Sequence, residues 1–596
     1  MLAFGQLFTT FASWDDEGYF LQLYRHFLSG SVLYDHLVSI YGPMTFFSGA
    51  ATAWFHLDNV SHDVFRWATL PVWVLIAVLL AGVVWSWTGK SLPSLIAFLL
   101  IGYRLKNLAT GIAHPQLWII LAVAILVALG LDWVWHPGQN MRALWAGILL
   151  GAVLLFKINV GIFVCIGVVL AVGLHVKGWM RIAFFGLPLF ASALFGVALL
   201  LATPFRSEVC YALAYLASLT ATVALVIRQA PPPTARRAAL AWLTAGACGC
   251  VCLVIALTLA MGSTLHSLIT DLVLYPGRFA TALHLQFWEP LGKGALITYP
   301  AAVVAVLAYW ALRFIRERAD WIGVLKFVIG SALVCGFLYN DRKALTASLL
   351  FLWLLVAGRK PSEPGYSNRL LLAALSPLFS LQLYPIAGSQ VDWAGLLPMT
   401  AAAILMADGI ESLERAGIAS SLRVAPAARA ITAVIALMFF VFSGVEAALF
   451  VTKWRRNSSL DVAGARWLHL SPADHVRVRT TVEAISRNCR EVLTVPRMPS
   501  FSLWSEVPMV EPKRMMAGPD DIREEEVREV REHEGGCVLV SEDTYLFWRK
   551  IGGVTGEDRL VPEIEKTMDS ISSVQDLSLY RSYSADEPYA TAHILK

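Results

Sequence analysis

Long apolar runs follow one another between residues 66 and 453, whereas residues 454–596 mix polar and apolar positions like an ordinary soluble sequence. A helix that crosses a bilayer needs about 20 mainly apolar residues. The pattern therefore predicts an α-helical polytopic membrane domain, residues 1–453, with more than ten transmembrane helices. Runs of full length lie at approximately 66–88, 115–134, 182–203, 208–227, 238–262, 294–314, 369–386 and 429–452, and shorter or conjoined runs lie near 92–103, 143–157, 158–175, 322–339, 344–357 and 393–410.

The first thirteen residues, MLAFGQLFTTFAS, are apolar but too short to cross a bilayer. They lack the basic n-region and the cleavage site of a signal peptide. We interpret them as the last half of a first spanning helix, either because the true start lies upstream or because this helix is incomplete.

The C-terminal segment 454–596 leaves the membrane at a basic anchor, Lys453-Trp454-Arg455-Arg456. Strands that alternate with helices predict a small soluble α/β domain. The segment Pro496–Trp504 follows the first predicted strand, where ligands often bind in such sheets, although an ordinary loop with aromatic packing explains it more simply. The predicted helices are 474–488 and 519–534, and the predicted strands are 490–495 and 536–541.

Two cysteines, Cys489 and Cys537, each lie beside one of the predicted strands of this domain. If the domain is extracytoplasmic, they could form a disulfide. The other cysteines lie in apolar runs, where free cysteines behave as small hydrophobic residues.

Composition agrees with a membrane protein and argues against a nucleic-acid partner. Apolar residues make up 57% of the chain and charged residues 15%, against about 25% charged residues in soluble domains. The net charge of +4 is spread over short loops between apolar runs, and no basic stripe suits nucleic acid.

Basic residues in alternate short loops predict the orientation. The set of loops that contains Lys90, Arg142 and Arg181 is placed in the cytoplasm, although Arg104 and Lys106 weaken the contrast. We therefore expect a multi-pass protein of an inner (plasma) membrane. On its outer side we expect a first extracytoplasmic loop at 14–65, an outer loop at 263–293 and the domain 454–596.

The first outer loop carries the most informative chemistry of the chain. Asp15, Asp16 and Glu17 are consecutive carboxylates, and an amphipathic helix follows them, with Gln22, Arg25 and His26 on its polar face and Phe20, Leu23, Tyr24 and Phe27 on the other. Such a helix should lie along the membrane surface. A partly desolvated carboxylate can act as a general base. The simpler alternative is that Ser13 and Asp16 form a capping box.

More of the loop has a recognisable order. Asp16-Glu17-x-Tyr19 is followed by a short helix that ends at Gly30, then by Tyr34-Asp35, Tyr41-Gly42-Pro43 and Arg66. This order resembles the N-terminal signature of the GT-C membrane glycosyltransferases, and is most similar to the branch of protein mannosyltransferases and aminoarabinose transferases.

The resemblance implies a donor that is a polyprenyl-phosphate sugar, a lipid, glycan or protein acceptor, and an inverting transfer. It implies that Asp16 is the catalytic base, that Glu17 or Asp15 assists it, and that Tyr19 and Asp35 belong to the substrate pocket. Members of the superfamily differ in their need for a divalent metal. Adjacent carboxylates could bind Mg or Mn together with phosphate oxygens. The sequence leaves the need for such a metal open and assigns no other cofactor.

Basic residues complete the predicted site. Lys157 lies between two apolar runs, and a lysine at membrane depth is costly and usually functional or paired. The resemblance makes it a contact of the lipid-linked phosphate, whereas the alternative is a lysine that extends to the interface and anchors a helix end. Arg104 and Lys106 are further candidates. A departure from the family lies near Asp392, where many members have a histidine.

Two alternatives to a glycosyltransferase stay open. A secondary transporter should show repeated halves and broken helices around polar residues at the midplane, and no repeat is evident. A non-catalytic scaffold for envelope assembly would require that the carboxylates be dispensable. The chain contains no HExxH, GxSxG or P-loop motif, so metalloprotease, hydrolase and nucleotide-driven functions lack support.

Overall fold

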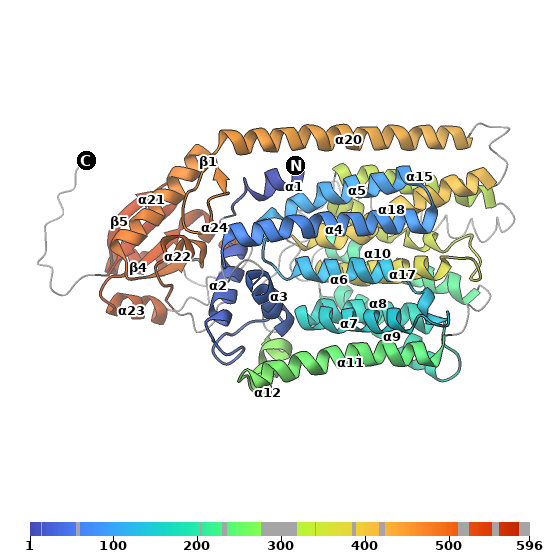
Figure 1. Cartoon of the computed structure of the whole chain (residues 1–596), viewed down its shortest axis with the longest axis horizontal. Helices are drawn as coiled ribbons and strands as arrows, with labels where there is room; N and C mark the ends of the chain where they lie inside the picture. Colours follow the sequence, from blue (N-terminus) through green and yellow to red (C-terminus); the bar gives the residue numbers. More distant parts are fainter. Residues whose placement is uncertain are drawn as a thin grey trace, which may run out of the picture.

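Helices run side by side along most of the molecule, and the C-terminal domain covers one end of them (Figure 1). We call this end the domain end. The structure, a computed structural model, describes residues 1–12, 15–54, 60–202, 206–228, 235–275, 319–339, 341–383, 389–415, 424–510, 524–550 and 560–582. Within these ranges, eight helices are long and apolar enough to cross a membrane, and four shorter apolar helices accompany them. The prediction of a helical polytopic membrane protein is confirmed.

The membrane helices follow the predicted apolar runs closely. The run 294–314 lies outside the described residues. The helices are α4 (His62–Thr88), α5 (Ser91–Leu105), α6 (Gln116–Leu129), α7 (Asn140–Phe156), α8 (Ile158–Gly173), α9 (Leu187–Ala202), α10 (Arg206–Arg228), α11 (Arg237–Ala260), α15 (Ala319–Tyr339), α16 (Asp341–Leu349), α17 (Tyr366–Ser380), α18 (Gln390–Arg415) and α20 (Val424–Arg456).

Some predicted boundaries were wrong. The run predicted near 92–103 is longer than expected, because α5 continues to Leu105 and the 3₁₀ helix η1 (Lys106–Thr110) extends it. The run 344–357 is not one helix, because α16 ends at Leu349 and the 3₁₀ helix η5 (Leu352–Leu355) follows. Both pieces are buried by neighbouring helices, so neither needs the length of a free span.

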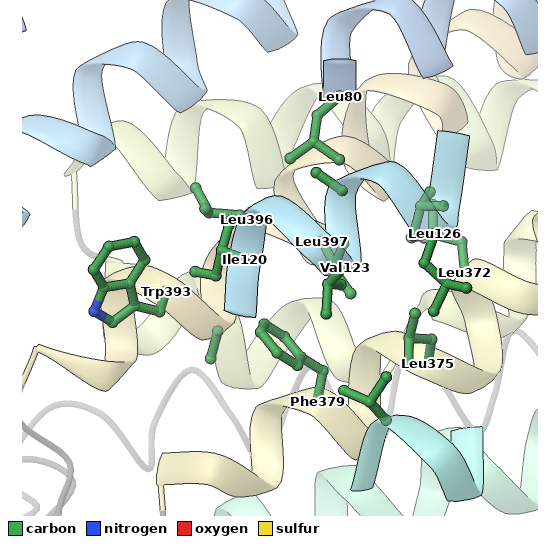
Figure 2. Packing of buried hydrophobic residues seen from close by; sticks show 14 of the residues in the cluster. Leu80, Ile120, Val123, Leu126, Leu372, Leu375, Phe379, Trp393, Leu396 and Leu397 are labelled. Carbon is green, nitrogen blue, oxygen red and sulfur yellow. The ribbon is translucent and has the colours of Figure 1, made fainter. Parts of the chain in front are cut away.

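The centre of the membrane domain is formed by α4, α6, α17 and α18. Every residue of α17 is buried, as is the whole apolar window of α18. Helices that are apolar on all sides are expected to be surrounded by other helices. Figure 2 shows how their side chains meet; it labels Leu80, Ile120, Val123, Leu126, Leu372, Leu375, Phe379, Trp393, Leu396 and Leu397.

A buried ion cluster joins α15, α17 and α18. The Asp408 carboxylate on α18 accepts hydrogen bonds from Arg369 on α17 at 2.7 and 2.9 Å and from Arg359 at 2.9 Å, and Lys326 on α15 lies 3.8 Å away. Asp408 and Arg369 are fully buried. A buried charge is tolerated only when it is paired and hydrogen-bonded, and the cluster meets this condition with side chains from separate helices.

The C-terminal domain has a four-stranded sheet in the order β3-β4-β6-β5, with β3 and β4 parallel and the other pairs antiparallel. The strands are β3 (Glu491–Val495), β4 (Gly536–Ser541), β5 (Asp569–Val574) and β6 (Leu577–Arg581), and the helices are α21 (Pro472–Asn488), α22 (Ser500–Ser505), α23 (Glu524–Glu532), α24 (Glu542–Lys550) and α25 (Leu560–Thr567). The predicted small α/β domain is present, with its first two strands within a residue of their predicted bounds. Cys489 and Cys537 form a disulfide, with their Cα atoms 5.7 Å apart.

The C-terminal domain is docked on the membrane domain through aromatic rings and backbone hydrogen bonds. The Asp63 carboxylate at the start of α4 accepts from the N–H groups of Arg466 and Trp467, at 2.7 and 3.1 Å. The N–H of His469, on the short strand β2 (His469–Leu470) that pairs with β1 (Ser458–Ser459), donates to the Phe8 carbonyl at 2.8 Å. Rings from both domains pack together around this joint: Phe4, Phe8, Trp67, Trp454, Trp467 and His469.

The N-terminal residues form α1 (Leu2–Leu7), a short helix that packs against α20, α4 and α5. A Cβ atom on Gly5 would come within 2.5 Å of the Phe450 Cβ on α20, so glycine allows this close approach. The described start of the chain thereby helps to build the joint between the two domains.

Candidate active site

The predicted site lies at the domain end, where helix α2 (Asp16–Leu28) and helix α3 (Pro43–Trp54) are placed between the membrane helices and α22 (Figure 1). Asp15 is the N-cap of α2, and its carboxylate accepts from the N–H of Gly18 at 3.0 Å. The helix therefore starts one residue after Asp15; Ser13, a partner in the predicted capping box, lies outside the described residues. The three carboxylates of the triplet have different surroundings.

Asp15 points into the C-terminal domain. Its carboxylate accepts from both the N–H and the hydroxyl of Ser500, at 2.7 and 2.6 Å. It is 2% exposed. Burial raises its pKa to about 7, while the hydrogen bonds from Ser500 and Gly18 lower it. Asp15 therefore acts here as a contact between two domains, with its oxygens already occupied.

Glu17 points towards the start of α4. It accepts two hydrogen bonds from Arg66, at 2.9 Å from Nε and 2.5 Å from Nη2. Arg66 is fully buried and also donates to the carbonyl groups of Leu7 and Thr10. Burial raises the pKa of Glu17, and the Arg66 charge lowers it. This bidentate pair joins α2, α4 and the described start of the chain.

Asp16 is the carboxylate of the triplet that stays accessible. It is half-buried, and within the described ranges its carboxylate has no hydrogen bond to another residue. Burial raises its pKa to about 7, and the positive charge of Lys157 lowers it. A half-open carboxylate with a pKa near neutral has the properties of a general base.

The charge of Lys157 acts on Asp16 from a break between two helices. It is the C-cap of α7 and the N-cap of α8, in an extended conformation. The Phe156 carbonyl left free by this break accepts from the N–H of Gly42 at 2.9 Å and from the Thr45 hydroxyl at 3.2 Å. A Cβ on Gly42 would overlap the Leu155 carbonyl oxygen. The Tyr41-Gly42-Pro43 motif thus docks the first loop onto the helix break that carries the lysine.

The rings of Tyr41 and His114 are hydrogen-bonded to each other near Lys157. The Lys157 ammonium lies 5.6 Å from the centre of the Tyr41 ring, and the Tyr41 hydroxyl lies 3.1 Å from Nε2 of His114. The N–H of Gln116 donates to Nδ1 of His114 at 3.0 Å. Nδ1 is therefore the acceptor and Nε2–H donates to Tyr41. Burial lowers the pKa of His114 well below its usual value, and the Lys157 charge lowers it further, so the ring is neutral.

Two other segments influence the pKa of Tyr19. Burial raises the pKa of its phenol, the neighbouring Ser39 hydroxyl lowers it, and the charges of Tyr275, Asp16 and Arg497 also act on it. Arg497 belongs to the loop after β3. Tyr275 follows the helix α12 (Leu265–Ile269) and the π-helix η4 (Thr270–Leu274) of the outer loop predicted at 263–293. Residues 276–293 of that loop lie outside the described residues.

The remaining predicted residues lie in other contacts. Asp35 is exposed and accepts from the N–H of Thr264, the N-cap residue of α12, at 2.9 Å. Arg104 donates to the Phe337 carbonyl and lies 3.9 Å from Asp392 on α18. Lys106 pairs with Glu446 on α20. Of the five predicted substrate-binding residues, Lys157 and Tyr19 are the two that interact electrostatically with Asp16.

The predicted surface position of α2 was wrong for most of the helix. Gln22, expected on an exposed polar face, is buried and bonds with His26 at 3.0 Å. Arg25 is exposed as expected. The amphipathic pattern describes the last turn, whereas α3, α4 and α22 pack against the helix and bury its earlier turns.

A metal site made by the carboxylate triplet does not fit this geometry, because Asp15 and Glu17 face separate partners in different segments. In the part of the chain that the structure describes, no group of three or more His, Cys, Asp or Glu residues could hold a metal ion.

A cavity of about 290 Å³ opens beside the site, between the end of α2, the start of α4 and the C-terminal domain. Arg25, His62 and Glu506 contribute its polar wall. His62 donates from Nε2 to the Ser500 hydroxyl, 2.8 Å away, so the cavity borders the Ser500–Asp15 contact.

Sequence reasoning did not identify His114, His62, Ser500 or Arg497 as site residues. The segment Pro496–Trp504 was singled out for its place after a strand, and this position holds both Ser500 and Arg497. The histidines stand in no fixed spacing to the acidic triplet, so nothing in the linear pattern relates them to it.

No protein-family model and no curated protein matches the chain. Among solved structures, the archaeal oligosaccharyltransferase AglB from Archaeoglobus fulgidus, in complex with an inhibitory peptide and a dolichol-phosphate, is 12% identical, with a TM-score of 0.41 over 96% of this chain and 70% of that chain. ArnT from Cupriavidus metallidurans bound to undecaprenyl phosphate is 12% identical, with a TM-score of 0.36 over 97% of this chain and 95% of that chain. ArnT is an aminoarabinose transferase, one of the two groups that the first outer loop resembles. At these TM-scores the likeness carries no functional argument, and the assignment of function rests on the site.

Substitution of Arg66 tests whether the Glu17–Arg66 pair stabilises the structure around the site. Arg66→Met should lower the stability of the protein by about 3–5 kcal/mol, because it leaves a carboxylate buried without its counter-charge. Protonation of Glu17 relieves this penalty, so the loss of thermal stability in detergent should be larger at pH 9 than at pH 6. The double variant Glu17→Gln with Arg66→Met should recover part of the loss. An Arg66→Met protein that melts like the wild type at both pH values would contradict the role of the pair.

Proposed function

We propose that the chain is a membrane glycosyltransferase, which transfers a sugar from a polyprenyl-phosphate carrier to an envelope acceptor on the extracytoplasmic side. The observation that carries the proposal is the arrangement of Asp16 and Lys157. A half-buried carboxylate without a hydrogen bond to a described residue feels the positive charge of a lysine that lies at the break between two membrane helices. A base and a cation at the edge of a membrane domain suit a reaction whose donor is an anionic lipid.

In the proposed mechanism, Asp16 takes the proton of an acceptor hydroxyl or amine as that group attacks the anomeric carbon of the sugar. The bond between this carbon and the phosphate oxygen breaks, and the phosphate leaves with the electron pair. Attack opposite the leaving group inverts the anomeric centre. The proton ends on Asp16, and the charge of the departing phosphate is stabilised by Lys157.

Lys157 is suited to this role by its position at a helix start. It precedes α8, whose first N–H groups have no partner within the helix and which carries partial positive charge at this end. Helix N-termini bind phosphate groups for these reasons. Tyr41 and the neutral His114 complete the wall beside the ammonium, and they add no competing charge.

Asp16→Asn should reduce sugar transfer about 10²- to 10⁴-fold, the usual contribution of a general base. The measurement is transfer by purified protein in detergent from a set of polyprenyl-phosphate sugars. Asp35→Asn removes an exposed carboxylate of the same loop and should retain most of the transfer. A loss in Asp35→Asn equal to that in Asp16→Asn would move the base to Asp35, and full activity of Asp16→Asn would remove Asp16 from the mechanism.

The rate should depend on pH through Asp16. A general base works in its deprotonated form, and burial raises the pKa of Asp16 to about 7. We therefore expect kcat/KM to rise with pH through the region around 7, because the carboxylate is half ionised at its pKa and ionises further as the pH rises. A profile already flat above pH 5 would contradict a base with this raised pKa.

Lys157→Met should weaken the use of the donor, with a rise in its KM or a fall in kcat of about tenfold or more, because the phosphate loses its counter-charge. Lys106→Met is the informative comparison, since Lys106 is a second lysine of the membrane domain that pairs with Glu446. It should lower thermal stability and leave the KM for the donor near the wild-type value. If Lys106→Met alone impaired donor use, the phosphate contact would be assigned to Lys106.

A further inference from the structure

We propose that Ser500, in the C-terminal domain, is a positioning residue of the candidate active site: its two hydrogen bonds to Asp15 hold the turn from which Asp16 departs. The inference rests on the proposed function for its consequence in catalysis. The contact itself joins residues that are 485 positions apart in the sequence. Both residues are buried, at 2% and 0% exposure.

The direction of the hydrogen bonds is fixed by a chain of donors behind Ser500. The indole of Trp504 can only donate, and its Nε1–H donates to Nδ1 of His62 at 3.1 Å. Nδ1 of His62 is thereby the acceptor, so Nε2–H donates to the Ser500 hydroxyl at 2.8 Å. The hydroxyl proton of Ser500 is then available for Asp15, at 2.6 Å.

The backbone at Asp15 makes this contact relevant to Asp16. Asp15 has φ 49° and ψ 41°, in the left-handed region that few residues other than glycine adopt. The next residue, Asp16, is the first residue of α2. The orientation of the Asp16 side chain therefore depends on a turn whose central carboxylate is held by Ser500 N–H, Ser500 Oγ–H and Gly18 N–H.

Gly18, on the first turn of α2, allows Ser500 to lie close to Asp15. A Cβ atom on Gly18 would overlap the Ser500 hydroxyl and would come within 2.5 Å of Asp15 Oδ2 and the Ser500 nitrogen. Glycine at this position of α2 allows α22 to lie directly against the first turn of the helix. Any larger residue must displace Ser500, Asp15 or both.

It follows that the geometry of the candidate base depends on the docking of the C-terminal domain. A domain that has not docked leaves Asp15 without two of its three donors, and the turn before Asp16 is then free to relax. The C-terminal domain would thus complete the active site.

The test compares full-length Ser500→Ala and Gly18→Ala with Ser502→Ala in detergent. Ser502 is a matched control, because it is a buried serine of the same helix whose hydroxyl donates to the Val507 carbonyl within the C-terminal domain, at 2.6 Å. Hydrogen–deuterium exchange should increase at the backbone amides of residues 16–19 in Ser500→Ala and Gly18→Ala and stay at the wild-type level in Ser502→Ala. Unchanged exchange in the first two variants, or an equal increase in all three, would overturn the proposal.

Kinetics with any donor that the wild type uses provide the second readout. In Ser500→Ala and Gly18→Ala we expect kcat to fall about tenfold or more while the KM for the donor changes little, because a small misplacement of a catalytic group is costly. The rise of kcat/KM with pH should move to lower pH as water reaches Asp16. Ser500→Thr keeps both donors and should restore activity. A wild-type pH profile in both variants would overturn the positioning role.

The two hypotheses fail in distinguishable ways. If the wild type transfers no sugar from any polyprenyl phosphate, the proposed function fails. The exchange measurement still decides whether Ser500 holds the turn before Asp16, since it needs no substrate.

Discussion

Three consecutive carboxylates at a domain junction impose the constraint on which this part of the structure depends. A buried carboxylate is costly unless it has hydrogen-bond donors or a counter-charge, and Asp15, Asp16 and Glu17 cannot share one partner. Their surroundings therefore come from separate parts of the chain. Ser500 of the C-terminal domain bonds with Asp15, Arg66 of α4 bonds with Glu17, and the charge of Lys157 acts on Asp16.

Each of these partners fixes a different segment against the start of α2. Arg66 also binds the carbonyl groups of Leu7 and Thr10, so the described start of the chain is held in the same cluster. Gly42 docks the middle of the first loop on the break between α7 and α8. Two of the three carboxylates, Asp15 and Glu17, attach the start of the loop. This division leaves Asp16, in the middle of the triplet, without a hydrogen bond to a described residue.

The membrane helices provide a stable platform for this arrangement. Apolar packing of α4, α6, α17 and α18 forms the centre of the domain, and the Asp408 cluster ties α15, α17 and α18 together through charged groups. The start of α4 carries His62, Asp63 and Arg66, which contact the C-terminal domain or α2. One rigid helix thus connects the core of the bundle to the site.

The sequence alone determined the features that depend on local pattern. Apolar runs of the right length predicted the membrane helices, since each such helix satisfies its own backbone hydrogen bonds. Alternating helices and strands predicted the C-terminal α/β domain, and the acidic triplet marked the loop where the site lies. The predicted bounds of 344–357 were wrong, because neighbouring helices surround these short pieces. The predicted exposure of Gln22 in α2 was wrong, because helical periodicity does not show which other elements pack against a helix.

Only the tertiary structure decided which carboxylate does what. Asp15, Asp16 and Glu17 are equivalent in the sequence, and their roles differ because their partners come from positions up to 485 residues away. Gly42 can approach the helix break at which Lys157 lies, and Ser500 reaches Asp15 because Gly18 has no side chain. Asp35, Arg104 and Lys106 looked as suitable as Lys157 by residue type, but their contacts are with Thr264, Asp392 and Glu446. Residue type determines which chemistry a side chain can perform, whereas its neighbours in space determine its pKa and its hydrogen-bond partners.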